Sequence, residues 1–306
     1  MPNFADRLLA AVKQRGNPVC VGLDPRLDQL PRELRERAER EHGRTPRAAA
    51  EAILAFNRAL LDALAGLAPV CKPQIAFYEE HGAEGLRAYA ETIRYAQGKG
   101  LLVISDAKRG DIGTTAEAYA RAHLTGAGGG FDADALTVNP YLGAETLQPY
   151  LDAGAARGKG IFVLVKTSNP GSGDLQDLPV NGRPLYEQVA EMVRKLGAAH
   201  RGASGFSAVG AVVGATYPEQ ARRLREMLPE TIFLVPGYGA QGATAKDVAA
   251  AFRADGLGAV VNSSRGIIFA YQREPYATRY GEARFAEAAR AAAEDMASEL
   301  RRALGG

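Results

Sequence analysis

The fold class that the sequence predicts is α/β, a (β/α)8 TIM barrel, and three observations predict it. Eight short apolar runs recur along the chain, patterns with helical spacing lie between them, and 306 residues suit a single barrel domain spanning 1–306. The runs are hydrophobic throughout rather than alternating, which favours parallel strands covered on both faces. A doubly wound open sheet is the alternative fold. The expected strands lie within 18–24, 70–77, 101–108, 133–140, 161–168, 206–215, 231–239 and 258–266.

An N-terminal helix precedes the first strand. In MPNFADRLLAAVKQRG the apolar residues Phe4, Leu8, Leu9 and Val12 fall at helical spacing, and the charges among them exclude a signal peptide. After the first strand, residues 26–45 form an extra charged excursion. Further helical patterns cover 46–67, 82–100 and 184–200, and a last one at 282–304 would close the outer ring.

Composition narrows the function classes. The net charge of +2 gives no reason to expect a nucleic-acid or membrane partner, and no run of 18 apolar residues occurs. Two cysteines, Cys20 and Cys71, lie in apolar runs without metal spacing, so we expect buried free thiols in a reducing cytoplasm. The four histidines lie away from the expected strand ends, and we predict no metal site. They are expected to be surface or helix residues.

A segment rich in Gly, Pro, Asn and Asp, residues 168–183, follows the fifth expected strand. Long irregular loops at the carboxyl end of a barrel strand often cover an active site. We therefore expect a lid here, with a disordered surface loop as the alternative.

Polar residues gather where the expected strands end, at the face where barrel enzymes build their sites. They are Asp24, Lys72, Asp106, Lys108, Asn139, Lys166, Ser168, Thr216, Gln241 and Arg265. Asp106 and Lys108 are two apart on one strand and should project to the same side. Asp111 could reach back from the turn and Lys72 could extend the charges into an alternating chain. A lysine between two carboxylates stays protonated and suits proton donation, although a structural ion-pair network is the alternative.

Two glycine-rich stretches predict a phosphate site. GYGAQG at 237–242 fits a dinucleotide fingerprint, but only one strand follows it, whereas dinucleotide folds begin with this turn. NSSRG at 262–266 ends the eighth strand and brings Ser264, Arg265 and Gly266. Loops after strands seven and eight commonly bind phosphate in barrels, through backbone N–H groups, here including that of Gly239, and an Arg fork.

With DAKRGDIGTT and the stretch from VGLDP to NSSRGI, the chain resembles orotidine 5'-phosphate decarboxylases, in particular their longer bacterial branch. The resemblance implies a cofactor-free homodimeric barrel that converts orotidine monophosphate to UMP and carbon dioxide. It implies that Lys72, Asp106, Lys108 and Asp111 form a charged tetrad in which Lys108 protonates carbon 6. It further implies that Asp24 binds ribose hydroxyls, Ser168 touches the pyrimidine, Gln241 and Arg265 hold the phosphate, and Asp111 and Thr115 reach the neighbouring subunit's site.

Two other functions remain open. A magnesium-dependent sugar-phosphate decarboxylase or aldolase on the same barrel shares the D-x-K-x-x-D pattern, although DIGTT and the pair of glycine-rich loops favour the nucleotide enzyme. A non-catalytic phosphate-binding barrel would keep both loops but would not need the charged tetrad.

Overall fold

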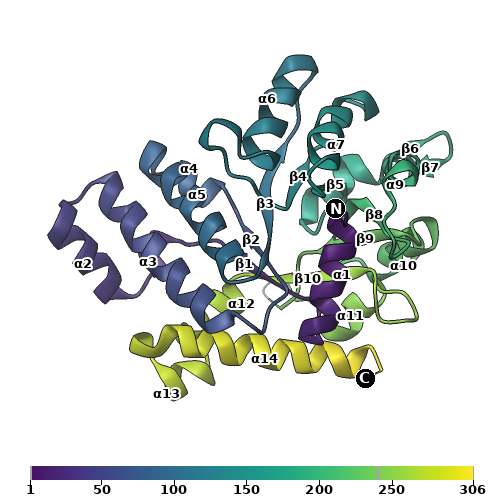
Figure 1. Cartoon of the computed structure of the whole chain (residues 1–306). Helices are drawn as coiled ribbons and strands as arrows, with labels where there is room; N and C mark the ends of the chain where they lie inside the picture. Colours follow the sequence, from purple (N-terminus) through teal and green to yellow (C-terminus); the bar gives the residue numbers. More distant parts are fainter. Residues whose placement is uncertain (1, 240–241, 306) are drawn as a thin grey trace.

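The computed structural model describes residues 2–239 and 242–305, and its main feature is a closed barrel of eight parallel strands (Figure 1). The (β/α)8 barrel predicted from the sequence is therefore confirmed. Around the barrel the strands follow the order β1-β10-β9-β8-β5-β4-β3-β2. They are β1 (Val19–Leu23), β2 (Val70–Pro73), β3 (Leu102–Arg109), β4 (Ala135–Val138), β5 (Gly160–Lys166), β8 (Ser207–Val213), β9 (Thr231–Val235) and β10 (Ala259–Ser263).

Helices connect and cover these strands (Figure 1). The longest are amphipathic and rich in alanine and leucine, which suits packing against a sheet. The helices of the described residues are α1 (Phe4–Arg15), α2 (Arg32–His42), α3 (Pro46–Leu64), α4 (Ala76–Glu79), α5 (Gly82–Gly98), α6 (Gly113–Leu124), α7 (Gln148–Ala155), α8 (Gly173–Gln176), α9 (Leu185–Gly197), α10 (Pro218–Met227), α11 (Ala245–Ala249), α12 (Arg265–Ile268), α13 (Tyr276–Tyr280) and α14 (Phe285–Ala303). Phe285 of α14 stacks on Phe56 of α3, with 5.2 Å between ring centroids.

Side chains of alternate strand positions form two apolar layers. Cys20 faces the barrel interior with Ile104 and Phe162, whereas Val19 and Val21 pack outward against the helices. The predicted N-terminal helix is present as α1, and it closes the amino-terminal end of the barrel. Its Phe4 meets Phe162 edge to face, with 5.7 Å between ring centroids. The opposite, carboxyl end of the barrel is thus left as the open end.

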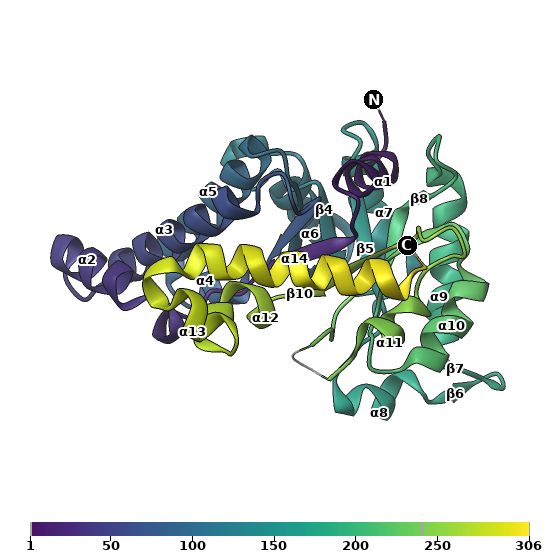
Figure 2. The same ribbon diagram turned by 90° about the horizontal axis from the view of Figure 1, so that it is seen from below.

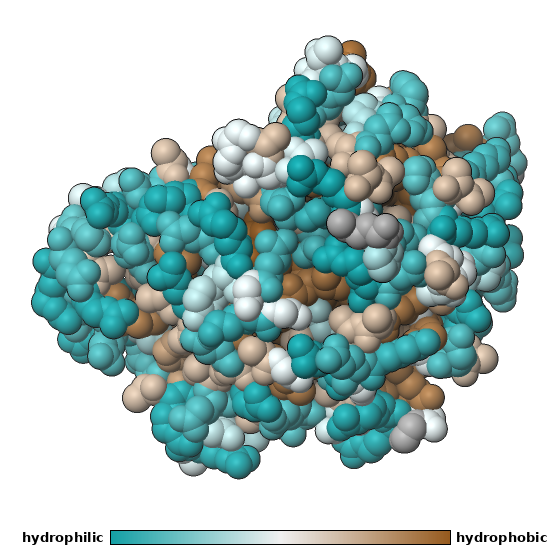
Figure 3. All heavy atoms as spheres, in the orientation of Figure 1, coloured by the Kyte–Doolittle hydropathy of each residue, from teal (hydrophilic) through white to brown (hydrophobic). Residues whose placement is uncertain are grey.

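The charged excursion after β1 forms a short 3-10 turn, Leu27–Gln29, and α2, which packs on α3. α2 projects to one side of the barrel, at the left of Figure 1, and this edge is hydrophilic over most of its surface in Figure 3. Most side chains of α2 are charged; the helix buries Ala38 and packs Leu34 partly against the core.

The segment 168–183 is more ordered than the irregular loop expected from sequence. It contains a 3-10 turn (Pro170–Ser172), α8, and a two-stranded hairpin of β6 (Pro179–Val180) and β7 (Arg183–Pro184). Asn181 and Gly182 both have positive φ, 52° and 77°, as a two-residue hairpin turn requires. Figure 2 shows α8, β6 and β7 on the side of the molecule opposite α1. They therefore stand at the carboxyl end of the barrel, where a lid would lie.

The strand β3 also carries a buried polar network on its outer side. Ser105 Oγ lies 2.7 Å from Tyr89 Oη and 2.8 Å from His123 Nδ1. His123 lies on α6 and is only 2% exposed, so it is a buried helix residue rather than a surface one. Burial, together with the charge of Arg109, lowers the pKa of His123 to about 3.

Within residues 2–239 and 242–305, no helix combines the length and apolarity needed to cross a membrane. In the same two ranges, His, Cys, Asp and Glu side chains form no group of three or more that could hold a metal ion.

Candidate active site

A cavity of about 450 Å³ opens at the carboxyl end of the barrel, on the side opposite α1. Most barrel strands bring a side chain to it from their last residues or from the loop that follows. Its lining consists of Asp24, Lys72, Asp106, Lys108, Thr137, Leu164, Thr167, Ser168, Asn169, Val212, Leu234, Pro236, Gly237, Tyr238, Asn262, Ser264 and Arg265. The cavity thus joins polar and charged groups with an apolar wall from β5, β8 and β9.

Three charged side chains meet at the ends of β2 and β3. The carboxylate of Asp106 accepts a hydrogen bond from Lys72 Nζ at 2.5 Å on Oδ2 and another from Lys108 Nζ at 2.6 Å on Oδ1. Lys72 and Asp106 are each 5% exposed, whereas the Lys108 side chain is 45% exposed. Lys108 is therefore the member of the array whose ammonium group reaches the open part of the cavity.

The charges of the array stabilise one another. Burial opposes the charged form of Lys72, but Asp106 and Asp24 outweigh it and raise the pKa of Lys72 above its usual 10.5. Burial likewise opposes the charged form of Asp106, and the two lysines outweigh it and lower its pKa well below the usual 3.8. Lys72 and Asp106 are therefore both charged at neutral pH.

One interpretation of the sequence was that Asp111 reaches back to Lys108 of the same chain. In the structure it does not. It lies in the turn after β3, and its Oδ1 accepts the backbone N–H of Ile112 at 2.8 Å. Thr115 follows on α6 and is exposed. Neither residue lines the cavity. Two large apolar side chains after β3 and β4 are exposed, Ile112 at 62% and Tyr141 at 76%.

Polar atoms without partners point to a binding function beside the array. Asp24 Oδ1, Asn262 Oδ1 and Ser264 Oγ are buried, and none makes a hydrogen bond of good geometry with the described residues, although the Ser264 hydroxyl lies near enough to Asp24 to lower its pKa. Burial raises the pKa of Asp24 above its usual value, although Lys72 opposes this. These three residues all line the cavity. Buried polar groups normally have partners, so a ligand with hydroxyl groups would satisfy them.

The predicted phosphate loops lie at the ends of β9 and β10. Ser264 and Arg265 line the cavity, and the Arg265 side chain is exposed and forms no ion pair with any residue that the structure describes. Gly239 and Gly266 line an adjoining cavity of about 410 Å³ rather than the main one. Gln241, predicted to hold the phosphate, lies outside the described residues. A Cβ on Gly22 would stand 2.7 Å from Ser264 Cβ, so a glycine there lets β1 approach this loop.

Ser168 lines the cavity, next to Thr167 and Asn169. Lys166, another polar residue at a strand end, does not. Its Nζ pairs with Asp177 at 2.8 Å, and the Gln176 side chain bonds Thr167. These contacts attach the segment 168–183 to the end of β5.

Sequence reasoning did not select Thr137, Asn169 or Asn262 as functional residues. Asn262 stands in the NSSRG stretch and Thr137 is a polar residue within an apolar strand, so both carried a signal. The role of each depends on a neighbouring strand, which the linear pattern does not give.

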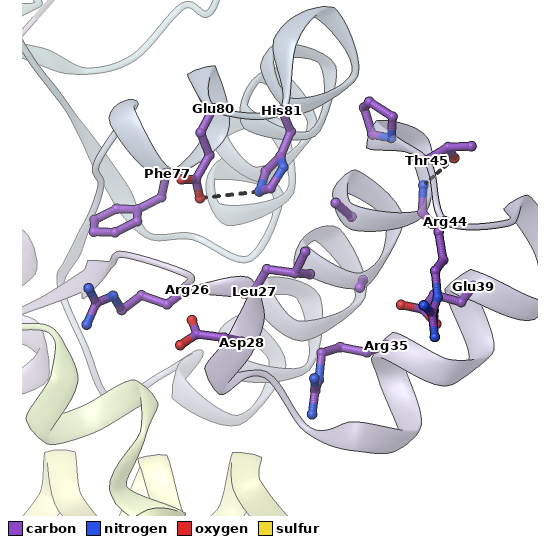
Figure 4. Close-up of a pocket in the computed structure, with 14 residues that line it drawn as sticks. Arg26, Leu27, Asp28, Arg35, Glu39, Arg44, Thr45, Phe77, Glu80 and His81 are labelled. Carbon is purple, nitrogen blue, oxygen red and sulfur yellow. Dashed lines mark hydrogen bonds and ion pairs between the residues drawn. The ribbon is translucent and has the colours of Figure 1, made fainter.

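A larger cavity of about 760 Å³ lies between α2, α3 and α4 (Figure 4). Arg26, Arg35 and Arg44 line it, and so do Asp28, Glu39 and Glu80. In Figure 4 His81 turns toward Glu80, 3.3 Å away. The positive and negative side chains of this larger cavity balance, and the cavity is separate from the lysine-aspartate array. We therefore place the chemistry in the smaller cavity.

A closed barrel with an array of charged side chains at the carboxyl ends of its strands defines an enzyme of the TIM-barrel class. The model of the orotidine 5'-phosphate decarboxylase / HUMPS family matches residues 17–280. The chain belongs to the orotidine 5'-phosphate decarboxylase family.

Individual relatives cover nearly the whole chain. An orotidine 5'-phosphate decarboxylase from Rhodopirellula baltica is 49% identical over 304 residues, 98% of this chain and 100% of that one. One from Petrotoga mobilis is 43% identical over 297 residues, 96% of this chain and 97% of that one. Among solved structures, Leishmania donovani OMP decarboxylase is 35% identical with a TM-score of 0.76, and 100% of each chain is covered.

Proposed function

We propose a route for the decarboxylation of orotidine 5'-phosphate to UMP and carbon dioxide, the reaction to which the chain's family membership points. The observation that carries the proposal is the array in which Lys72 and Lys108 lie 2.5 Å and 2.6 Å from the carboxylate of Asp106. The bond between carbon 6 and the carboxylate breaks, and its electron pair stays on carbon 6. Lys108 Nζ then gives its proton to that carbon.

The array suits this step because carbon 6 has no adjacent group that could delocalise the electron pair. A fixed ammonium group stabilises the developing charge and is also the proton source. Asp106 orients Lys108 and faces the substrate carboxylate. Lys108, left neutral after the transfer, regains a proton from solvent, which its 45% exposed side chain can reach.

The remaining site residues bind the nucleotide in this proposal. Arg265 and Ser264, with backbone N–H groups of Gly239 and Gly266 and the side chain of Gln241, hold the phosphate. Asp24 takes ribose hydroxyls, for which its buried Oδ1 without a partner is the support. Asn262 shares that feature and joins it. Ser168 contacts the pyrimidine, under the segment 168–183.

The protein is proposed to act as a homodimer with shared sites. Asp111 accepts the backbone N–H of Ile112 and does not line the cavity of its own chain, and Thr115 follows it on exposed surface. The exposed side chains of Ile112, next to Asp111, and of Tyr141, after β4, are suited to contact with a second copy. In such a dimer, Asp111 and Thr115 of one chain would complete the array of the other.

We further propose that residues 1–306 act as one barrel domain without a cofactor, in the cytoplasm. One apolar cluster extending from Val19 to Leu300 supports the first point. The free, buried thiols of Cys20 and Cys71 support a reducing compartment. A chelator separates this proposal from a magnesium-dependent sugar-phosphate enzyme: turnover of orotidine 5'-phosphate should survive exhaustive dialysis, and loss that magnesium restores would favour the other enzyme.

The central test is Lys108→Ala assayed on orotidine 5'-phosphate. We expect kcat to fall by far more than tenfold with the fold intact, because the residue stands at the end of a strand. Lys195→Ala on the outer face of α9, where the side chain is 71% exposed, is the matched control and should keep full activity. A Lys108 variant that keeps more than about a tenth of wild-type kcat, a barrier change under about 1.4 kcal/mol, would exclude Lys108 as the proton donor.

A further inference from the structure

We infer that Thr137 is a positioning residue for the reaction, and that its hydroxyl holds Lys108 and Asp106 in their working geometry. The inference rests on the proposed role of Lys108 as proton donor. Thr137 lies on β4, is 1% exposed, and stands beside the end of β3 that carries the array.

The end of β3 is irregular where it passes Thr137. Ser105 pairs with Leu136 and Arg109 pairs with Val138, so three residues of β3 stand opposite the single residue Thr137. Such a bulge removes regular ladder partners from the backbone groups within it. Lys108 lies in this bulge with φ of 48°, a left-handed conformation that residues other than glycine seldom adopt.

The Thr137 hydroxyl supplies the missing partners. Its Oγ1 accepts the backbone N–H of Ala107 at 3.0 Å and that of Lys108 at 2.9 Å. It donates to Asp106 Oδ1 at 3.0 Å, which is nearer than its other acceptor, the Ser105 carbonyl at 3.5 Å. One hydroxyl therefore fixes both the backbone of the proton donor and the carboxylate that orients it.

The same hydrogen bonds indicate how the residue acts. A hydroxyl has one proton and two lone pairs, and here all three are engaged by the protein itself. Although Thr137 lines the cavity, its hydroxyl has little left to offer a substrate. Its loss should therefore displace the ammonium of Lys108 without removing a binding contact. The effect should fall on kcat and leave KM nearly unchanged.

The test compares Thr137→Val, which has the same shape without the hydroxyl, with Thr137→Ser, which keeps the hydroxyl. We expect kcat to fall between about tenfold and about a hundredfold in Thr137→Val, because small displacements of catalytic groups cost that much. KM and the affinity for UMP, measured by calorimetry, should stay within about twofold of wild type. Thr137→Ser should restore kcat to within about threefold.

A matched control separates positioning from general damage. Thr231 is 4% exposed and begins β9 at the other end of the barrel, so Thr231→Val makes the same change away from the array. We expect Thr231→Val to keep the wild-type kcat. If Thr137→Val does not fold, Thr137→Ala, which leaves room for water, is compared with Thr137→Ser instead. Equal kcat in the variants with and without the hydroxyl, or a loss confined to KM, would overturn the inference.

The assay of Lys108→Ala in parallel distinguishes two kinds of failure. An active Lys108→Ala would refute the proposed function itself. An inactive Lys108→Ala together with a fully active Thr137→Val would refute only the role of Thr137.

Discussion

Replacing Asp106 by asparagine should damage stability and turnover together, and the structure gives the size of the first effect. The substitution keeps the shape of the side chain but removes the charge that Lys72 and Lys108 contact at 2.5 Å and 2.6 Å. Lys72 is 5% exposed, so its ammonium group would be left buried without its main partner. Breaking a buried ion pair in this way costs about 3–5 kcal/mol. Because Asp24 still favours the charged form of Lys72, we expect about 3 kcal/mol.

The pH dependence has a definite sign. In the wild type the pKa of Lys72 is raised above 10.5 and that of Asp106 is lowered below 3.8. The ion pair therefore stabilises the fold fully between pH 3.8 and pH 10.5, the ordinary pKa values of the two groups. Its contribution is lost as Lys72 deprotonates at higher pH and as Asp106 is protonated at lower pH. In Asp106→Asn the buried Lys72 is easier to deprotonate than in the unfolded chain. The stability deficit relative to wild type should therefore shrink as pH rises from 7 toward 10.5.

A second substitution separates stability from catalysis. Lys72→Met in the Asp106→Asn background removes the unpaired charge, so it should return at least about 2 kcal/mol of unfolding free energy. It should return no turnover, because Lys108 still lacks the carboxylate that orients it. Urea unfolding at several pH values and kcat on orotidine 5'-phosphate measure both. Unchanged stability in Asp106→Asn at pH 7, or a double variant less stable than the single one, would refute this account of the array.

Three further outcomes are expected. Arg265→Ala should lower kcat/KM strongly for orotidine 5'-phosphate and little for orotidine, which lacks the phosphate; steady-state kinetics on both would show equal losses if Arg265 lay outside the phosphate site. Inactive Lys108→Ala and Asp111→Ala homodimers, mixed and refolded, should regain about a quarter of wild-type activity, since half the dimers become hybrids with one intact site; subunit exchange confirmed by mass without recovery would exclude a shared site. Between pH 6.5 and pH 3 the unfolded chain binds a proton that buried His123 does not, which lowers the unfolding free energy of the wild type by about 1.4 kcal/mol per pH unit as pH falls. His123→Gln should remove this part of the acid destabilisation. Parallel curves of stability against pH for the two proteins would contradict this.

The barrel could be predicted from sequence because its strands are apolar on both faces. Their limits were less accurate. The run 70–77 was expected as one strand, yet β2 ends at Pro73 and α4 begins at Ala76. The hairpin 179–184 was not expected because each strand has only two residues, too few for a pattern, even though its Asn181-Gly182 turn is typical of hairpins.

The contact between Asp106 and Lys108 was predicted correctly, but for a reason that holds only in part. Spacing by two places side chains on one face of a regular strand, whereas here the backbone at Lys108 is left-handed and the strand is bulged. The hydrogen bonds of Thr137 depend on the register between β3 and β4, which arises from distant parts of the chain. In the proposed dimer, Asp111 would stand beside the array of a second chain, which the pattern of one sequence does not give.

The helix α1 has a consequence for the order in which the chain takes shape during synthesis. Phe4 rests on Phe162, Asn3 Nδ2 donates to the His200 carbonyl at 3.1 Å, and Asp6 accepts backbone N–H groups of Ala203 and Ser204. This segment therefore has its partners among residues that a ribosome makes some 160 to 200 positions later. Until those residues have emerged, the apolar face of α1 has nowhere to dock, and the floor of the barrel stays open. The helix α1 is thus translated well before its partners and is fixed in place only after them.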